Sequence, residues 1–544
     1  MKVKQLKDPL YGYIAIPVDI MSGVVDTAVF QRLRRITQTS YSPLFSSAVH
    51  NRFVHSLGVY YLGSIAAKTL NREIKCLLEE SPEMVDLNVD HLEFIFLLAC
   101  LLHDIGHAPF SHTGEMFYLE NGQDYHQLHD MLKEAVGTET FCRDVPDERS
   151  AAAAPHEVMS AIVGIREFGH LMPSASDKEF FARCITGYGY VCHAGMEGIR
   201  NCFIQLLNSK VIDVDKLDYL IRDAYITGFD TVNIDYERLL TSLTVVLEGS
   251  DYSLAYYKRA ISVIENVVYA HDLERKWMQN HPVVLYENYI LQHIMELLTE
   301  KLDAGSQKLF SAESLSIRGQ SLQGGVQVRL FSDDDIISLI KRYYEEYEII
   351  SEYFERRARR HPLWKSEAEY KAFFLDHVRG GDLLDALEAA MEATAKYLSK
   401  NTTNWVINQE LADTLRKDLK ELPAAKVDKK SKETQEKEKR EILKVVECLI
   451  RYAESVDYKG DFVLLKSSQF NSGFAKPDFS ATKIVFSSVG KEKVVSFGEK
   501  VSSILGVTSE RVNFFYLYSR CDKETETPKL DINQLRRELF REFV

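Results

Sequence analysis

Apolar residues between about positions 20 and 300 recur mainly at helical spacing, and the stretch from Phe94 to Leu102 is the clearest case. These nine residues are all apolar, and Phe94, Leu98 and Leu101 fall at i, i+4 and i+7, the spacing of one helical face. Apolar residues also occupy the opposite side, so we expect this helix to be buried all round. Nine residues are about half the length that crosses a bilayer, and we expect no association with membranes.

The pattern changes twice after residue 300. Between about 300 and 445 the chain is more charged, and three glycines in residues 319–325 indicate a loop. Residues 426–441 contain a single apolar residue, which indicates a solvated helix or a mobile linker. In the last hundred residues, β-branched and aromatic runs at 484–486, 494–495 and 512–518 predict strands, and residues 531–544 return to a helical pattern.

These patterns predict a mainly α protein with three parts. We expect a helical core over residues 1–300, a helical and charged region over 301–445, and a smaller C-terminal α/β subdomain over 446–544. Within the core, four alanines followed by Pro155 indicate a connection into a helix that has Pro155 in its first turn.

Composition and charge narrow the function classes. The 544 residues are 45% hydrophobic and 27% charged, which is typical of globular proteins and excludes a largely disordered chain. The net charge of −14 disfavours nucleic acid as the main partner. Eight scattered cysteines, none in a CxxC pair, argue against a disulfide scaffold, and we expect a cytoplasmic protein.

Four strongly polar residues follow the apolar helix directly: His103, Asp104, His107 and His112. Polar side chains at the end of a buried helix need partners, because unpaired burial costs a few kcal/mol each. Adjacent His103 and Asp104 can offer an imidazole nitrogen and a carboxylate oxygen to one cation. His55 and Asp215 are further candidates, and together the four residues form a mixed N/O set that suits Mn, Fe or Zn, with positions left for water and a phosphate oxygen.

The wider sequence contains a specific series of motifs. In chain order they are Asp8-Pro9 with Gly12, residues 25–27 with 30–34, residues 50–53 with 55–59, residues 103–107 with 109–112, and residues 213–216. The order His … His-Asp … Asp is the HD phosphohydrolase pattern, and the series resembles the HD-domain deoxynucleoside triphosphate triphosphohydrolases, which include bacterial dGTPase-like enzymes. The resemblance covers about residues 3–300 and continues faintly beyond them. It does not include the sterile alpha motif domain of vertebrate members.

The resemblance assigns roles to individual residues. It implies that His55, His103, Asp104 and Asp215 bind a divalent metal (Mn, Fe, Zn or Mg), with further Mg on the nucleotide phosphates. It implies a catalytic group of His107, His112, His156 and Glu115. It implies that the substrate contacts Gln38, Thr39, Arg52, Lys216, Tyr219, Asp223 and Arg275, with His271 as the alternative to Arg275.

The resemblance also implies a second nucleotide that regulates activity. Lys4, Asp26, Gln31 and Arg34 match the regulatory site, which in the resembling enzymes lies between subunits. We therefore expect a homo-oligomer (a dimer, tetramer or hexamer) that responds to a nucleotide effector.

The function that follows is metal-dependent hydrolysis of a deoxynucleoside triphosphate (dNTP) to deoxynucleoside and inorganic triphosphate, in control of nucleotide pools or in defence against phage. Two alternatives stay open: an HD phosphodiesterase or alarmone hydrolase, and a nucleotide-sensing regulator with weak catalysis.

Overall fold

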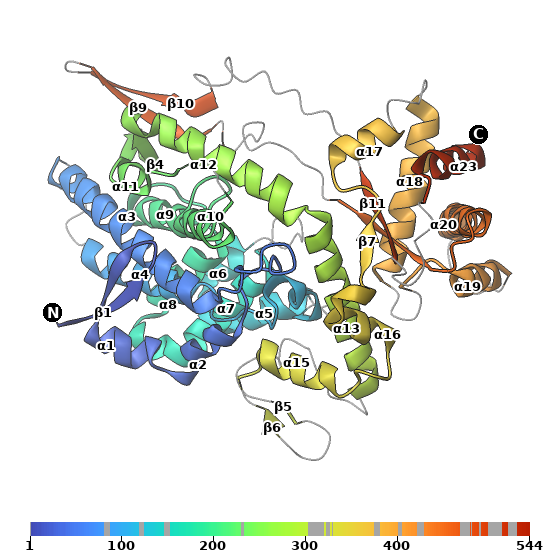
Figure 1. Ribbon diagram of the computed structural model, residues 1–544. Coiled ribbons are helices and arrows are strands. Elements are labelled where there is room, and N and C mark those ends of the chain that lie inside the picture. Colours follow the sequence, from blue (N-terminus) through green and yellow to red (C-terminus); the bar gives the residue numbers. More distant parts are fainter. Residues whose placement is uncertain are drawn as a thin grey trace. The chain divides into compact units, whose positions relative to one another are not determined.

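The protein is mainly α-helical, as the sequence predicts (Figure 1). The structure is a computed structural model that describes residues 2–80, 88–118, 125–145, 153–229, 233–302, 320–321, 327–328, 330–374, 381–400, 405–420, 429–467, 479, 481–488, 491–498, 514–520 and 530–543. The chain forms two compact units. Unit 1 comprises residues 1–274, 302–337 and 471–509, and unit 2 comprises 275–301, 338–470 and 510–544.

Unit 1 contains the candidate site. Its helices are α1 (Val18–Ile20), α2 (Ala28–Gln31), α3 (Arg52–Glu80), α4 (Val89–Leu102), α5 (Tyr125–Val136), α6 (Glu139–Asp144), α7 (Pro155–Phe168), α8 (Ala175–Thr186), α9 (Gly195–Leu207), α10 (Val214–Thr227), α11 (Tyr236–Leu240) and α12 (Ile261–Glu274). Helix α15 (Asp333–Lys341) begins in unit 1 and ends in unit 2.

Two small sheets accompany these helices. An N-terminal hairpin pairs β1 (Val3–Asp8) with β2 (Gly12–Pro17), with Val3 opposite Pro17. A four-stranded sheet has the order β10-β9-β4-β3, formed by β3 (Leu243–Glu248), β4 (Asp251–Tyr257), β9 (Lys483–Ser488) and β10 (Lys491–Ser496). The short strands β5 (Gln320–Ser321) and β6 (Gln327–Val328) also pair.

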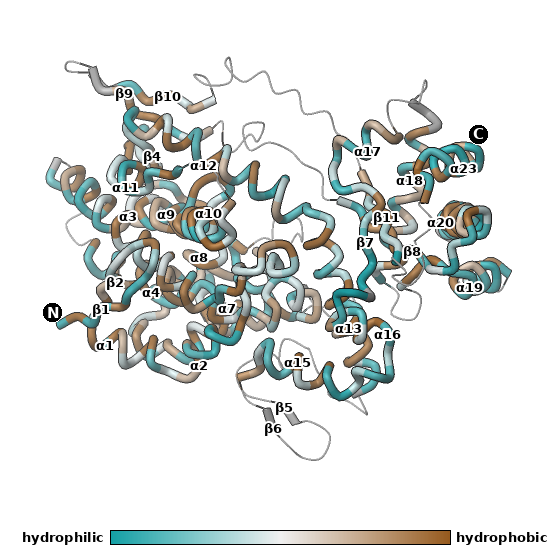
Figure 2. Tube along the Cα trace, viewed as in Figure 1, coloured by the Kyte–Doolittle hydropathy of each residue, from teal (hydrophilic) through white to brown (hydrophobic). Residues whose placement is uncertain are grey.

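Unit 2 combines helices with a three-stranded sheet of order β7-β11-β8. Its elements are α13 (Pro282–Leu302), α16 (Glu348–Phe354), β7 (Arg360–Pro362), α17 (Glu367–Phe374), α18 (Gly381–Leu398), α19 (Gln409–Lys420), α20 (Lys429–Ser455), β8 (Phe462–Lys466), β11 (Phe515–Arg520) and α23 (Ile532–Phe543). Helix α20 gives residues 429–441 a helical structure, and the side chains of residues 434–441 are exposed or half-buried, so the solvated helix is confirmed for this stretch. Helices α19 and α20 are largely hydrophilic (Figure 2).

The compact units do not coincide with the expected division at residues 300 and 445. Strand β9 pairs in parallel with β4, so a late segment completes a sheet that begins in the core. The strands expected at 484–486, 494–495 and near 512–518 are present as β9, β10 and β11. The loop expected at residues 319–325 lies mostly outside the described residues.

Helix α4 provides the apolar support of the site. It packs against α3, α8 and α9, and its residues from Ile95 to Leu102 are buried except Leu97, which is half-buried. The expectation of burial all round is wrong at Phe94, which is 37% exposed because the neighbouring helices cover the other faces. Among the described helices, none has the combination of length and hydropathy needed to cross a bilayer.

Candidate functional site

The four expected metal ligands lie together in unit 1. His55 is in the first turn of α3, and His103 and Asp104 directly follow α4, while Asp215 is in the first turn of α10. His55 Nε2 lies 3.2 Å from His103 Nε2 and 2.9 Å from Asp215 Oδ1. We call these four residues the metal-ligand cluster.

Asp104 completes the metal-ligand cluster. Its Oδ1 lies 3.4 Å from His103 Nε2 and its Oδ2 lies 3.6 Å from His55 Nε2. His55, His103 and Asp104 are buried, whereas the Asp215 side chain is 36% exposed. A ligand can therefore approach the cluster from the side of Asp215.

The hydrogen bonds of the two imidazoles fit a metal. His55 Nδ1 lies 2.7 Å from Asp218 Oδ2, and His103 Nδ1 lies 2.9 Å from the carbonyl oxygen of Cys100. Both oxygens are acceptors, so each Nδ1 donates, and each Nε2 can offer its lone pair to a cation once it is deprotonated. Two lone pairs that converge with two carboxylates are the arrangement that a divalent cation satisfies.

A buried network fixes Asp218. Arg222 donates from Nε to Asp218 Oδ2 at 2.8 Å, and Tyr11 Oη donates to Asp218 Oδ1 at 2.8 Å. Arg222 also pairs with Asp8 at 3.1 Å, which links the N-terminal hairpin to the network. Gly58 permits this approach, because a Cβ at its position would lie 1.8 Å from Asp218 Oδ1. Asp218 supports His55 in the way that carboxylates support metal-ligating histidines.

The Arg52 side chain is held by hydrogen bonds with other residues of the site. It is buried and donates from Nε to Ser111 Oγ at 2.9 Å, and from Nη1 to Asp104 Oδ2 at 2.9 Å. Burial alone would raise the pKa of Asp104, but the Arg52 guanidinium holds it well below its usual value. Arg52 therefore keeps an expected metal ligand ionised.

Three histidines surround one carboxylate. Glu115 Oε1 lies 2.7 Å from His112 Nδ1, 2.9 Å from His156 Nδ1 and 3.4 Å from His107 Nδ1. The rings of His107 and His156 stack with their centres 4.2 Å apart. We call these four residues the histidine cluster. It adjoins the metal-ligand cluster because His107 Nε2 lies 3.2 Å from Asp104 Oδ1.

The environments of the histidines separate their pKa values. Burial, together with Arg52 and His156, holds the pKa of His107 well below its usual value. Burial would also lower the pKa of His156, but Glu115 raises it to about 9. At neutral pH His107 is therefore neutral and His156 carries a proton. His112 is the most open of the three, with 68% of its side chain exposed.

Local structure explains how α7 brings His156 to this position. Helix α7 begins at Pro155, as predicted, and the Glu157 carboxylate accepts a hydrogen bond from the Ala154 amide at 2.6 Å. Gly106, in the loop that follows α4, allows this loop to pack closely on α7, because a Cβ there would lie 2.3 Å from the Ser160 amide nitrogen.

Helix α10 carries the expected phosphate and sugar contacts. Asp213 caps its first turn by accepting a hydrogen bond from the Lys216 amide at 2.7 Å. Lys216 Nζ bonds to Asp213 Oδ2 at 2.5 Å and to the Ser209 carbonyl oxygen at 2.7 Å, and its side chain is 24% exposed. Tyr219 lies one turn further along the helix, and burial raises its pKa well above the usual value, so its phenol is neutral.

His50 connects two expected substrate residues. Its Nε2 lies 2.8 Å from Asp223 Oδ1, and its carbonyl oxygen accepts a hydrogen bond from the Gln38 amide at 3.0 Å. Within the described part of the chain, the buried atoms Gln38 Oε1 and Thr39 Oγ1 have no hydrogen-bond partner. Buried polar atoms of this kind are available to a bound ligand.

The expected regulatory residues lie on the hairpin and the segment that follows it. Lys4 Nζ lies 3.8 Å from Asp26 Oδ2, and Arg34 Nε donates to Gln31 Oε1 at 2.8 Å. The Arg34 guanidinium also lies 3.5 Å from the centre of the Phe53 ring. Lys4 thus pairs with Asp26, and Arg34 pairs with Gln31.

Arg275 belongs to unit 2, where it starts a short π-helix over Arg275–Gln279, and its contact with the substrate stays a prediction. The alternative, His271, lies in α12 of unit 1 with its Nδ1 3.8 Å from Asp272 Oδ1.

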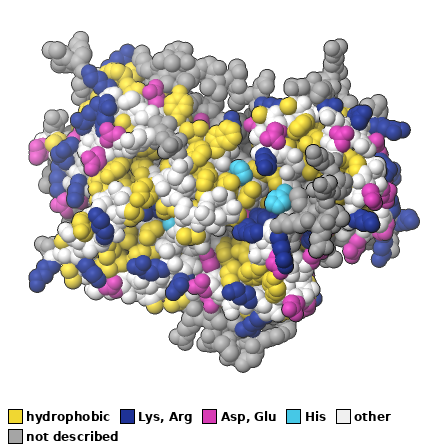
Figure 3. Space-filling model, viewed as in Figure 1, with side chains coloured by type: hydrophobic (Ala, Val, Ile, Leu, Met, Phe, Trp, Pro, Cys, Tyr) yellow, Lys and Arg dark blue, Asp and Glu magenta, His cyan; other side chains and the backbone are white. Residues whose placement is uncertain are grey.

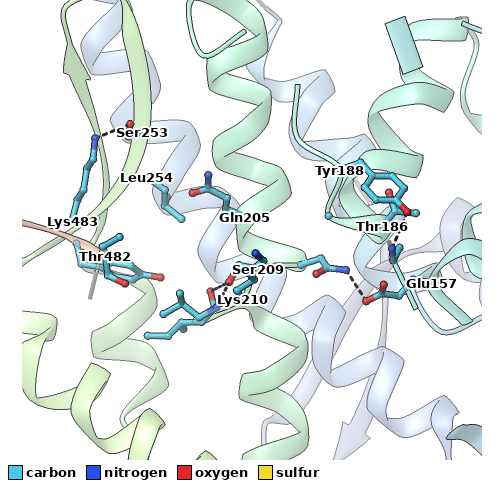
Figure 4. A pocket seen from close by; sticks show the side chains of 17 residues that line it. Glu157, Thr186, Tyr188, Gln205, Ser209, Lys210, Ser253, Leu254, Thr482 and Lys483 are labelled. Atoms are coloured by element: carbon cyan, nitrogen blue, oxygen red, sulfur yellow. Dashed lines mark hydrogen bonds between the residues drawn. The ribbon is translucent and has the colours of Figure 1, made fainter. Parts of the chain in front are cut away.

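A cavity of about 590 Å³ borders the site (Figure 4). Glu157, Tyr188 and Gln205 line it together with Ser209, Lys210 and Lys483, and it contains none of the expected metal or substrate residues among the described side chains. One of its lining residues, Ser209, accepts a hydrogen bond from the Lys216 ammonium through its carbonyl oxygen.

Three supporting residues were not predicted from the sequence: Asp218, Ser111 and His50. Asp218 could have been found, because it lies three residues after Asp215 and therefore near the same face of α10. No local pattern indicates the roles of the other two.

Comparison with known proteins agrees with the HD pattern of the residues at this site. The model of the HD domain family matches residues 52–159, which contain His55, His103 and Asp104, so the chain contains an HD domain. The chain is 27% identical to the uncharacterized protein YwfO of Bacillus subtilis over 56% of this chain and 57% of that one. It is 30% identical to the deoxynucleoside triphosphate triphosphohydrolase SAMHD1 of Danio rerio over 44% of this chain and 36% of that protein.

The chain thus spans about half the length, or less, of these curated relatives. Two solved structures have a similar fold at 18% identity: a hypothetical protein from Aquifex aeolicus, with a TM-score of 0.52 over 99% of this chain and 100% of that one, and a phosphohydrolase from Bacteroides thetaiotaomicron, with a TM-score of 0.53 over 96% and 100%.

Proposed function

We propose that this protein is a phosphohydrolase that cleaves deoxynucleoside triphosphates to deoxynucleoside and inorganic triphosphate. The observation that carries the proposal is the contact between the two clusters, where Asp104 lies within 3.4 Å of His103 and 3.2 Å of His107. A phosphate held at the metal-ligand cluster would lie beside groups that can transfer protons. Similarity to relatives named deoxynucleoside triphosphate triphosphohydrolase supports this choice of substrate.

His55, His103, Asp104 and Asp215 would hold the divalent metal. Two imidazoles and two carboxylates are compatible with Mn, Fe or Zn, and Mg would accompany the triphosphate. Such a metal, when bound, polarises a phosphoryl oxygen and lowers the pKa of water.

Lys216 is the principal cation for the triphosphate. Its ammonium is held by Asp213 and the Ser209 carbonyl oxygen but stays partly exposed, so it can add a charge-assisted hydrogen bond to phosphate. Arg52 donates from Nε to Ser111 and from Nη1 to Asp104, and its main contribution is to hold Asp104.

The histidine cluster handles the protons of the reaction. Water attacks the α-phosphorus, the bond between phosphorus and the 5′-oxygen breaks, and one water proton is lost while the departing oxygen gains one. The His112–Glu115–His156 group, which retains a proton at neutral pH, donates to the 5′-oxygen, with exposed His112 nearest to the ligand. Neutral His107 can accept the proton that leaves the water.

The nucleoside would lie along α10. Tyr219 offers a flat apolar face to the sugar, and Asp223 and Gln38, joined through His50, offer acceptors to the 3′-hydroxyl. The unpartnered Gln38 Oε1 and Thr39 Oγ1 supply further polar contacts. We also propose that a nucleotide at Lys4, Asp26, Gln31 and Arg34 regulates a homo-oligomer.

Nucleic acid is not proposed as the main partner. On the face shown in Figure 3, Lys and Arg side chains lie among Asp and Glu side chains, which agrees with the net charge of −14.

Product analysis tests the proposal. The purified protein is incubated with each dNTP, singly and in mixtures, with Mg²⁺ or Mn²⁺, and tripolyphosphate and deoxynucleoside are quantified. Release of both in equal amounts, lost on chelation and in Asp104→Ala, is expected. Pyrophosphate with a monophosphate, or cleavage of a diester instead, would indicate another HD hydrolase, and no product from any mixture would favour a nucleotide-sensing regulator.

A further inference from the structure

A short segment far from the HD domain in sequence is built into the site. Phe331, Ser332 and Asp333 are all buried, and they belong to unit 1 although they follow the end of the matched HD domain by more than 170 residues. We call these three residues the bridging segment.

Asp333 joins two loops of the site through its two oxygens. Oδ1 accepts a hydrogen bond from the Phe110 amide at 2.6 Å, and Oδ2 accepts one from the Thr37 amide at 2.8 Å. Phe110 belongs to the loop between His107 and His112, and Thr37 precedes Gln38. One carboxylate therefore ties the loop of the histidine cluster to the loop that carries the expected sugar contacts.

Arg32 adds a second link between the bridging segment and the same loop. Its buried guanidinium donates from Nε to the Phe331 carbonyl oxygen at 2.7 Å and from Nη2 to the His107 carbonyl oxygen at 2.8 Å. The loop is thus held at His107 and at Phe110.

The held loop has a backbone conformation that needs support. Phe110 and Ser111 have φ values of 58° and 52°, in the left-handed region that non-glycine residues rarely adopt. Ser111 Oγ in turn donates to the Thr37 carbonyl oxygen at 2.5 Å and accepts from Arg52 Nε at 2.9 Å. Because Arg52 binds Asp104, the position of Ser111 affects a metal ligand.

The role of Asp333 is separable from the stability of its own helix. Asp335, not Asp333, bonds back to the Ser332 amide at 2.8 Å and to Ser332 Oγ at 2.9 Å at the start of α15. The hydrogen bonds that Asp333 accepts at Phe110 and Thr37 both belong to the site loops.

We propose that Asp333 is a positioning residue, which holds residues 107–111 and residue 37 in the arrangement that directs Arg52 to Asp104 and the histidine cluster to the substrate. The catalytic part of this proposal rests on the proposed function. The structural part does not, since it concerns the loop itself.

The test compares Asp333→Asn with Asp335→Asn, which disturbs the start of α15 but not the loops. In Asp333→Asn, the side-chain NH₂ group faces one of the two backbone N–H groups, of Phe110 or Thr37. One hydrogen bond is therefore lost with almost no change in side-chain size. Full-length proteins are compared at about pH 8, where the carboxylate is ionised. Hydrogen exchange of peptides covering residues 36–38 and 107–113 is measured with metal content and steady-state kinetics.

In Asp333→Asn we expect faster hydrogen exchange in both peptides and a kcat lower by roughly ten- to a hundredfold. KM and metal content should stay near the wild-type values. Asp335→Asn should resemble the wild type in all of these. Ser111→Ala should be non-additive with Asp333→Asn in kcat, because the two act on one path.

Unchanged exchange and kcat in Asp333→Asn would overturn the proposal, as would equal losses in both variants, which would assign the effect to α15. If the wild-type protein releases no tripolyphosphate, the proposed function fails, and the exchange comparison alone then decides whether Asp333 holds the loops.

Discussion

His55 Nδ1 lies 2.7 Å from Asp218 Oδ2, and both side chains are completely buried. Asp218 is also held by Arg222 and Tyr11, so the orientation of one imidazole of the metal-ligand cluster is determined by a network that reaches the N-terminal hairpin. Burial would lower the pKa of His55, but its hydrogen bonds with Asp215 and Asp218 raise it to about 10. A metal that binds His55 must therefore displace a proton that these carboxylates favour.

The first prediction concerns Asp218 as the support of His55. Asp218→Asn should weaken metal binding by roughly ten- to a hundredfold, the usual cost of losing such a partner. Metal titration by calorimetry measures the effect. Tyr11→Phe, which removes one hydrogen bond and leaves the charge, should have a smaller effect in the same direction, and exposed Asp130→Asn should have none. Wild-type affinity in Asp218→Asn would contradict the role.

The second prediction concerns the metal ligands themselves. His103→Ala and Asp104→Ala should remove both the bound metal and hydrolysis, while the fold persists because α4 is held by its own apolar packing against α3 and α8. Elemental analysis and circular dichroism separate the two effects, and exposed His170→Ala is the control. Full metal occupancy in both variants would exclude this assignment.

The sequence predicts the helical core and the site well where chemistry and spacing are local. His103 and Asp104 follow an apolar run, and the α10 residues share a helical face, so their juxtaposition follows from helical periodicity. The histidine cluster depends on long-range packing instead. His156 reaches Glu115 from α7; the resemblance places both residues in one catalytic group, but neither it nor a spacing rule indicates their contact.

Other features depend on contacts between distant segments. Strand β9 pairs with β4 across more than 200 residues, so a division based on composition assigns it to the C-terminal subdomain. The contacts of Arg52 also depend on distant segments. An arginine side chain suits phosphate, but the Arg52 guanidinium donates to the Ser111 hydroxyl and to the Asp104 carboxylate. Ser111 lies in the loop whose residues Phe110 and Ser111 have left-handed backbone conformations.

The third prediction separates Arg52 from Lys216. Lys216→Ala should keep the metal and lower kcat/KM by roughly ten- to a hundredfold, the value of a lost charge-assisted contact of about 1.5–3 kcal/mol. Arg52→Ala should lower kcat/KM and also release metal, because it leaves Asp104 buried without its cation. Metal content and kinetics are measured on the same samples. Equal metal content in the two variants would show that Arg52 does not support Asp104.

The fourth prediction concerns pH. His156 is protonated below its raised pKa of about 9, so activity that requires this proton should fall as the pH rises through about 9. Glu115→Gln removes the carboxylate that raises the pKa, and the alkaline limb should then move down toward about 6.5, the ordinary value for histidine. Profiles of kcat/KM against pH measure the shift, with exposed Glu237→Gln as the control. The same limb in Glu115→Gln and wild type would rule out this proton.

The last prediction concerns regulation. Arg34 donates a hydrogen bond to Gln31, and its guanidinium lies 3.5 Å from the centre of the Phe53 ring. Because Phe53 is in the first turn of α3, an effector that binds Arg34 can act on the start of this helix. One nucleotide should then stimulate hydrolysis of another, because an effector that favours the active assembly increases its population. Arg34→Ala should abolish this stimulation and keep the metal, whereas neighbouring Arg35→Ala, which loses only an exposed pair with Asp334 at 3.3 Å, should retain it. Paired-nucleotide kinetics and sedimentation are the measurements. Hyperbolic kinetics with every single dNTP, no cross-activation in any pair and an unchanged oligomer on nucleotide addition would together exclude regulation at this site.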